Sequence, residues 1–67
     1  MNKNEVIRDA LRHKRKKETL ERAIGRAVRR FGGNYEDYIE IMSCIREKRE
    51  SENLGLLEAA RRVADED

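Results

Sequence analysis

The chain is 67 residues long and 45% of them are charged, so it can form at most one domain with little apolar material. A single cysteine, Cys44, excludes an internal disulfide and a zinc site built from several cysteines, and no apolar run approaches the roughly 18 residues that span a membrane. We therefore expect a cytoplasmic protein without a membrane segment, a metal or a cofactor. No catalytic constellation stands out, so we do not expect an enzyme.

Charge is divided unevenly along the chain. Residues 1–33 carry 11 Lys and Arg against 4 Asp and Glu, whereas residues 34–67 carry 5 against 10. The halves therefore have formal charges of +7 and −5. This asymmetry indicates that one half faces a polyanion or an acidic surface, or that the halves of two copies pair head to tail.

The absence of proline and the small number of β-branched residues predict helix along nearly the whole chain. We predict that residues 1–33 form one basic helix, with Asn4 as its N-cap and Gly32-Gly33 as its end. The wholly polar residues 12–19 separate two apolar clusters within it. We expect the helix to continue through this segment because no Gly or Pro interrupts it; the alternative is a break near Glu18-Thr19.

Residues 34–53 predict a second, amphipathic helix, which Asn34 can cap. At about 100° per residue, its apolar side chains cover well over half of the circumference, more than one neighbouring helix requires. These side chains are Tyr35, Tyr38, Ile39, Ile41, Met42, Cys44 and Ile45. We expect this helix to lie between the first helix and a further packing partner.

Residues 54–67 predict a short third helix that follows a joint at Leu54-Gly55. Its last three residues, 65–67, are acidic and oppose the helix dipole, so they should fray.

The predicted fold class is all-α, with a hairpin of two longer helices plus a short C-terminal helix. The 25 apolar residues include six alanines, one Phe and no Trp, so a single chain can build only a thin core. We expect self-association to complete it, as a homo-oligomer and most simply as a dimer. The candidate interface residues are Leu20, Ile24, Phe31, Tyr35, Tyr38, Ile41, Met42, Ile45, Leu56 and Leu57.

Residues 12–17 read Arg-His-Lys-Arg-Lys-Lys and could neutralise several phosphates of a nucleic acid. The candidate nucleic-acid-binding residues are Arg12, Lys14, Arg15, Lys16 and Lys17. No aromatic residue interleaves this run to stack bases, and Glu18 and Glu21 can pair with Lys14 and Lys17 at helical spacing. A merely solvated helix face is therefore the competing interpretation.

Other polar residues give weaker chemical signals. His13 has no second histidine or cysteine at helical spacing to share a metal, and Cys44 is best interpreted as a small buried apolar residue. The carboxylate pairs Glu36/Glu40 and Glu47/Glu50 have the helical spacing used for Mg²⁺, but such pairs arise by chance in so acidic a segment.

Two short segments resemble parts of known families. Residues 4–11, Asn-Glu-Val-Ile-Arg-Asp-Ala-Leu, resemble the start of the first helix in ribbon-helix-helix regulators, including many antitoxins, where that helix follows a DNA-reading strand. Only Met1 to Lys3 precede the segment here, so the family's base contacts correspond to no residue of this chain. Residues 56–63 are similar to the first helix of a helix-turn-helix, without a recognition helix after it.

Two functions follow from these patterns. In the first, the chain is a protein-protein interaction module of an antitoxin-like or other regulatory kind, whose N-terminal half oligomerises while its acidic half docks a basic protein partner. In the second, it binds nucleic acid independently of sequence through residues 12–17.

Overall fold

The computed structural model describes residues 1–66, and Asp67 lies outside the described residues. The described chain forms four helices and no strand: α1 (Lys3–His13), α2 (Leu20–Arg30), α3 (Tyr35–Glu52) and α4 (Leu56–Asp65). The predicted all-α class is therefore confirmed. Because α1 begins at Lys3 and no strand precedes it, the described residues do not reproduce the strand of the ribbon-helix-helix pattern.

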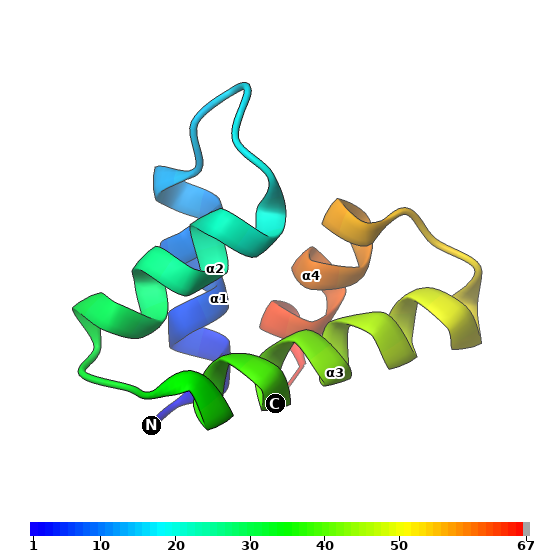
Figure 1. The fold of residues 1–67 in the computed structure, drawn as a ribbon. Coiled ribbons are helices and arrows are strands. Elements are labelled where there is room, and N and C mark those ends of the chain that lie inside the picture. Colours follow the sequence, from blue (N-terminus) through cyan, green and yellow to red (C-terminus); the bar gives the residue numbers. More distant parts are fainter. Residues whose placement is uncertain (67) are drawn as a thin grey trace.

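The four helices contact one another in a closed ring (Figure 1). α1 packs on α2, α2 on α3, α3 on α4, and α4 returns to pack on α1. The two chain ends are joined by side-chain hydrogen bonds from α1: Arg8 Nη2 donates to the carbonyl of Ala64 at 2.7 Å, and Asn4 Nδ2 donates to the carbonyl of Glu66. The fold thus consists of two helix pairs, rather than one long hairpin with an appended third helix.

The prediction of a single unbroken helix over residues 1–33 is wrong, and the alternative break near Glu18-Thr19 is confirmed. Lys14 leaves the helical conformation with φ −61° and ψ 129°, and Thr19 caps α2 by accepting a hydrogen bond from the Arg22 amide at 3.2 Å. The N-cap of α1 is Asn2 rather than Asn4; its side chain accepts from the Glu5 amide at 3.2 Å.

Burial of the two apolar clusters explains this break. In one straight helix the clusters would lie far apart along the axis, each without a partner. When α2 folds back on α1, Val6 and Ile7 of α1 and Ile24 of α2 all become inaccessible to solvent. Four consecutive cations at residues 14–17 also disfavour helix in the connecting segment, because like charges at helical spacing repel.

One core runs through all four helices and is enclosed by the side chains of a single chain. It contains 15 apolar side chains, each exposed by 5% or less. They are Val6, Ile7, Ala10, Leu20, Ala23, Ile24, Ala27, Val28, Ile41, Met42, Ile45, Ala59, Ala60, Val63 and Ala64. All six alanines of the chain are among them, and their small side chains allow close approach of helices at the contacts where they lie.

The corner between α2 and α3 is tightly built. Gly32, with φ 75°, ends α2, as predicted. Gly33 has no space for a side chain, because a Cβ atom there would lie 2.9 Å from Val28 Cγ1 and would also clash with the Met1 side chain. Asn34 is the predicted N-cap of α3 and forms a reciprocal capping box with Asp37, with hydrogen bonds of 2.9 and 3.0 Å.

The joint between α3 and α4 also matches the prediction. Asn53 adopts the left-handed conformation that ends α3, and Gly55 is the N-cap of α4. At the acidic end, α4 runs as far as Asp65, and the Glu66 carboxylate then pairs with Lys48 of α3 at 2.5 Å. Glu66 is therefore tied to α3 instead of fraying, and Asp67 lies outside the described residues.

Two isoleucines of α3 test how much of the stability resides in this core. Ile45 is fully buried, whereas Ile39 is 43% exposed. We expect Ile45→Ala to lower the free energy of unfolding by about 2–5 kcal/mol, because it leaves a cavity, and Ile39→Ala to lower it by less than about 1 kcal/mol. Urea denaturation followed by circular dichroism measures both, and equal losses would contradict the assignment of Ile45 to the core.

Candidate nucleic-acid interface

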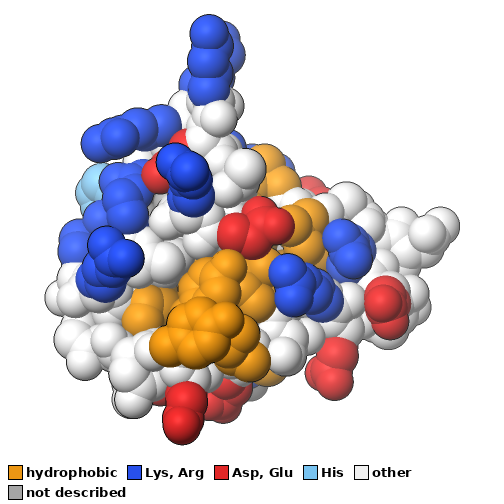
Figure 2. Space-filling model, viewed as in Figure 1, with side chains coloured by type: hydrophobic (Ala, Val, Ile, Leu, Met, Phe, Trp, Pro, Cys, Tyr) orange, Lys and Arg blue, Asp and Glu red, His pale blue; other side chains and the backbone are white. Residues whose placement is uncertain are grey.

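Basic side chains gather over the 14–19 segment and the adjoining helices, while apolar side chains show over the start of α3 (Figure 2). Within residues 1–66, several of these cations form no ion pair with a carboxylate. We call one set of them, on the loop and on α2, the basic surface: Lys14, Arg15, Lys16, Lys17, Arg22 and Arg29. Arg12, the remaining candidate, is exposed in the last turn of α1 and also forms no ion pair among the described residues.

The acidic half does not neutralise this surface within the described chain. Each ion pair of residues 1–66 joins two residues of the same half. In the C-terminal half, Glu52 pairs with Lys48 at 2.9 Å and with Arg62 at 2.8 Å. These contacts lower the pKa of Glu52 and raise the pKa of Lys48, for which the largest cause is its hydrogen bond with Glu66.

Glu18 holds the basic loop against α2. Its carboxylate accepts hydrogen bonds from Arg26 Nε at 2.8 Å and from the Arg15 amide at 3.0 Å, and Arg26 Nη2 also donates to the carbonyl of His13 at 3.2 Å. The hydrogen bond from Arg26 is the main cause that lowers the pKa of Glu18. The predicted pairing of Glu18 with Lys14 is not formed, because the segment between them is not helical.

A groove runs between α2 and the start of α3. It is a hollow of about 420 Å³ lined by Glu21, Arg22, Gly25, Arg29, Gly33, Asn34, Tyr35 and Tyr38. A second hollow of about 380 Å³ shares Arg22, Gly25 and Arg29 with it and extends to Arg15 of the loop. Because the two hollows share these three residues, we describe them together as the α2 groove, which reaches from Arg15 of the loop to the tyrosines and is also lined by Glu18 and Glu21.

Both tyrosines of the chain form one wall of the α2 groove. The rings of Tyr35 and Tyr38 are stacked, with centroids 5.9 Å apart and planes at 23°, and Tyr35 is 74% exposed. The run 12–17 itself contains no aromatic residue. The structure instead brings the tyrosines from the next helix to two of the four arginines of α2, Arg22 and Arg29, neither of which was a predicted site residue.

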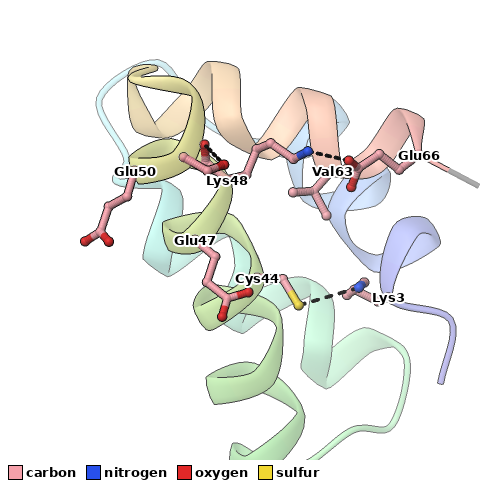
Figure 3. A pocket seen from close by; sticks show the side chains of 8 residues that line it. Lys3, Cys44, Glu47, Lys48, Glu50, Val63 and Glu66 are labelled. Atoms are coloured by element: carbon pink, nitrogen blue, oxygen red, sulfur yellow. Dashed lines mark hydrogen bonds and ion pairs between the residues drawn. The ribbon is translucent and has the colours of Figure 1, made fainter.

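A larger hollow, of about 740 Å³, lies between the start of α1 and the ends of α3 and α4 (Figure 3). Lys48 reaches across it to Glu66, and Lys3 Nζ lies 3.5 Å from Cys44 Sγ, so its cations are already engaged. Glu47 and Glu50 are drawn at its rim, pointing away from Lys48. Its walls carry both signs of charge, which favours no single kind of ligand.

No metal-binding cluster takes shape within the described part of the chain. Residues 1–66 contain no cluster of three or more His, Cys, Asp or Glu that could hold a metal. His13 lies at the opposite end of α1 from Lys3 and Cys44, about 15 Å along the helix, and its Nδ1 lies 3.2 Å from Asp9 Oδ1. Cys44 is half-buried against the core, close to its predicted structural role.

The predicted interface residues fall into three groups. Leu20, Ile24, Ile41, Met42 and Ile45 belong to the core of the single chain, so they are not accessible to a second copy in this fold. Tyr38, Leu56 and Leu57 are half-buried against that core. Only Phe31, at 42%, and Tyr35 are exposed, and Met1 and Ile39 join them as large exposed apolar side chains.

Comparison of the chain with protein-family models, with curated proteins and with solved structures gives no match. None of the helices in residues 1–66 combines the length and the apolar character needed to cross a membrane. The roles of individual residues therefore follow from their own geometry and charge.

The Glu18 contact predicts a pH dependence of stability. Its carboxyl has a lower pKa in the folded chain than in the unfolded chain, so the contact stabilises above the ordinary glutamate pKa and is lost as the pH falls below about 4. We expect Glu18→Gln to lower the melting temperature at pH 7, and this difference from the unmodified chain to shrink at pH 3. Melting followed by circular dichroism at both pH values measures it.

The matched control is Glu47→Gln, because Glu47 is an exposed glutamate that forms no ion pair within residues 1–66. This variant should melt close to the unmodified chain at both pH values. A Glu18→Gln deficit that is the same size at pH 3 and pH 7 would contradict the charge-dependent contact.

Proposed function

We propose that this protein binds nucleic acid through its phosphates, with the basic surface as the contact. The observation that carries this proposal is the group of six cations on one loop and one helix whose side chains form no ion pair with a carboxylate within residues 1–66. Of the acids close in sequence, Glu18 binds Arg26 and Asp9 binds Arg30, and Glu21 forms no ion pair with any of the six cations within residues 1–66. The positive charge therefore remains available to an external polyanion.

The physical basis is counterion release. Each phosphate neutralised by a lysine or arginine frees condensed cations from the nucleic acid, which gives affinity that falls steeply as salt rises. Phosphate contacts carry no sequence information themselves, so binding through this surface is largely independent of sequence. The long lysine and arginine side chains at 14–17 suit this role, because they can follow a flexible phosphate backbone without a fixed geometry.

Replacing the loop cations tests this proposal. We expect the fourfold variant Lys14→Gln, Arg15→Gln, Lys16→Gln and Lys17→Gln to make the dependence of log affinity on log salt shallower by up to about 3–4 units. Fluorescence anisotropy of a labelled DNA duplex, titrated at several salt concentrations between about 50 and 200 mM, measures the slope.

The control removes arginines from the other half of the chain. Arg46 and Arg49 form no ion pair within residues 1–66 and lie on α3, outside the basic surface. Arg46→Gln with Arg49→Gln should leave the slope unchanged. A slope that the fourfold variant does not alter would exclude the loop as the phosphate contact, and absence of binding at low salt would exclude the function.

We propose as a second candidate that the chain acts as a protein-interaction module through α3. Four glutamates of α3 form no ion pair within residues 1–66 and fall on one face at helical spacing: Glu36, Glu40, Glu47 and Glu50. Ile39, 43% exposed, lies at the edge of this face. An acidic face with an apolar edge suits a basic protein partner, including the basic surface of a second copy in a head-to-tail dimer.

Self-association through this face predicts a dimer in solution. Sedimentation velocity at about 100 µM protein should give twice the chain mass, with the dimer weakening as salt rises because opposite charges meet across it. Ile39→Lys should return the protein to a monomer, whereas Phe31→Lys, at a similarly exposed apolar side chain at the end of α2 and outside this face, should not. A monomer at this concentration and low salt would exclude self-association, leaving only a different basic protein as the partner.

A further inference from the structure

We propose that the α2 groove holds the unpaired bases of a single-stranded nucleic acid, so that the protein prefers single strands to duplex. This inference rests on the proposed phosphate-binding function and adds to it the kind of nucleic acid that is bound. It is carried by three features that meet in the groove: an exposed aromatic stack, a helix position without a side chain, and a continuous line of cations.

The tyrosine stack offers a platform for a base. Tyr35 leaves 74% of its surface exposed although it is large and aromatic, and its ring continues the stack that it forms with Tyr38. Aromatic faces bind bases of any identity by stacking, which is how single-strand-binding proteins combine affinity with sequence tolerance. A base laid on Tyr35 would extend an existing pair of stacked rings.

Gly25 keeps the floor of the groove open. It lies in the interior of α2, where glycine is the least favourable residue after proline, and its backbone does not adopt the positive φ that would require glycine. No neighbouring atom requires its small size either, since a Cβ atom there would meet nothing within 4 Å. Internal packing therefore gives no reason for this glycine, whereas close approach of a ligand to the helix does.

The cations fix the path of the strand. Arg22 and Arg29 line both hollows of the α2 groove on either side of Gly25, and Arg15 continues the line towards the loop. Phosphates can follow these arginines while the bases turn towards the tyrosines. Glu21, the carboxylate at the tyrosine end of the groove, disfavours a phosphate there and can accept a hydrogen bond from an N–H group of a base, such as the ring N3–H of thymine.

The groove cannot make with a duplex all of the contacts that it can make with a single strand. In a double helix the base faces are stacked on one another, so a duplex can meet the arginines with its phosphates but cannot place a base on Tyr35. A single strand uses both kinds of contact. The positive charge of the groove argues against a basic peptide as the occupant, and the exposed aromatic face adds a contact that an acidic peptide would not require.

The experiment compares a fluorescein-labelled single-stranded oligothymidylate of about 12 nucleotides with a labelled duplex of about 12 base pairs. A strand of about 12 nucleotides is within the range of site sizes that single-strand-binding domains occupy. Fluorescence anisotropy at about 50 mM salt gives both affinities. We expect tighter binding of the single strand. Tyr35→Ala should weaken single-strand binding about tenfold, leave duplex binding within about twofold, and be rescued by Tyr35→Phe, which keeps the ring.

Intrinsic fluorescence gives a second readout of the groove. The chain has two tyrosines, both in the groove wall, and no tryptophan, so its emission reports on the groove alone. Unlabelled oligothymidylate should quench this emission, after correction for absorption, and the duplex should not. Gly25→Gln should reduce both quenching and single-strand affinity while circular dichroism stays helical, and Ser43→Gln, exposed on α3, should change neither.

The outcomes separate this inference from the proposed function. Equal single-strand and duplex affinities that Tyr35→Ala does not change would overturn the groove proposal while phosphate binding stands. Failure to bind either probe would overturn the proposed function and the inference with it. Tyrosine emission that changes with protein concentration, but not with oligothymidylate, would place a second copy of the chain in the groove and overturn the inference.

Discussion

The fold depends on the return of α2 onto α1. Neither helix of this pair can cover its apolar face alone, and a continuous helix would leave both faces in water. The turn at residues 14–19 lets Ile7 and Ile24 enter one core, and α4 completes this core with Ala59, Ala60 and the residues beyond. Because the alanines take up little space, helices of only 10 to 18 residues pack closely enough to exclude solvent from 15 side chains.

The same turn determines where charge accumulates. It places four consecutive cations at one end of the molecule, and two nearby carboxylates are already engaged: Glu18 holds the turn through Arg26, and Asp9 of α1 binds Arg30 of α2. The acids of the C-terminal half bind cations of their own half, such as Lys48 and Arg62. The uneven distribution of charge along the sequence therefore appears as an uneven distribution of charge over the surface. Concentrated like charge lowers stability through self-repulsion, which salt screens and a bound polyanion would relieve.

Local signals predicted much of the fold. Gly32 and Asn34 define the α2 to α3 corner, and the Leu54-Gly55 joint separates α3 from α4, because these residues act through their own backbone conformation. The break before Thr19 was predicted only as the alternative to a continuous helix, because no Gly or Pro marks it; its cause is burial between segments distant in sequence. Ile24 and Ile45, which were predicted for the interface, lie in the core of the single chain, since apolar periodicity does not distinguish a face that meets another helix from one that meets another chain.

The α2 groove could not be predicted from the sequence, because Arg22 and Tyr35 lie on different helices and meet only through the corner between them. Its features share one property, which is that none of them serves stability. Gly25 weakens α2, Tyr35 leaves an aromatic ring in water, and Arg22 and Arg29 have no carboxylate partner within residues 1–66. Elsewhere the local sequence agrees with the fold, in its caps, joints and buried alanines. In the α2 groove, by contrast, an unfavourable helix residue, an exposed aromatic ring and cations unpaired within residues 1–66 lie together at one concave site. A bound ligand would compensate for all three, which is the physical argument for a binding role of this groove.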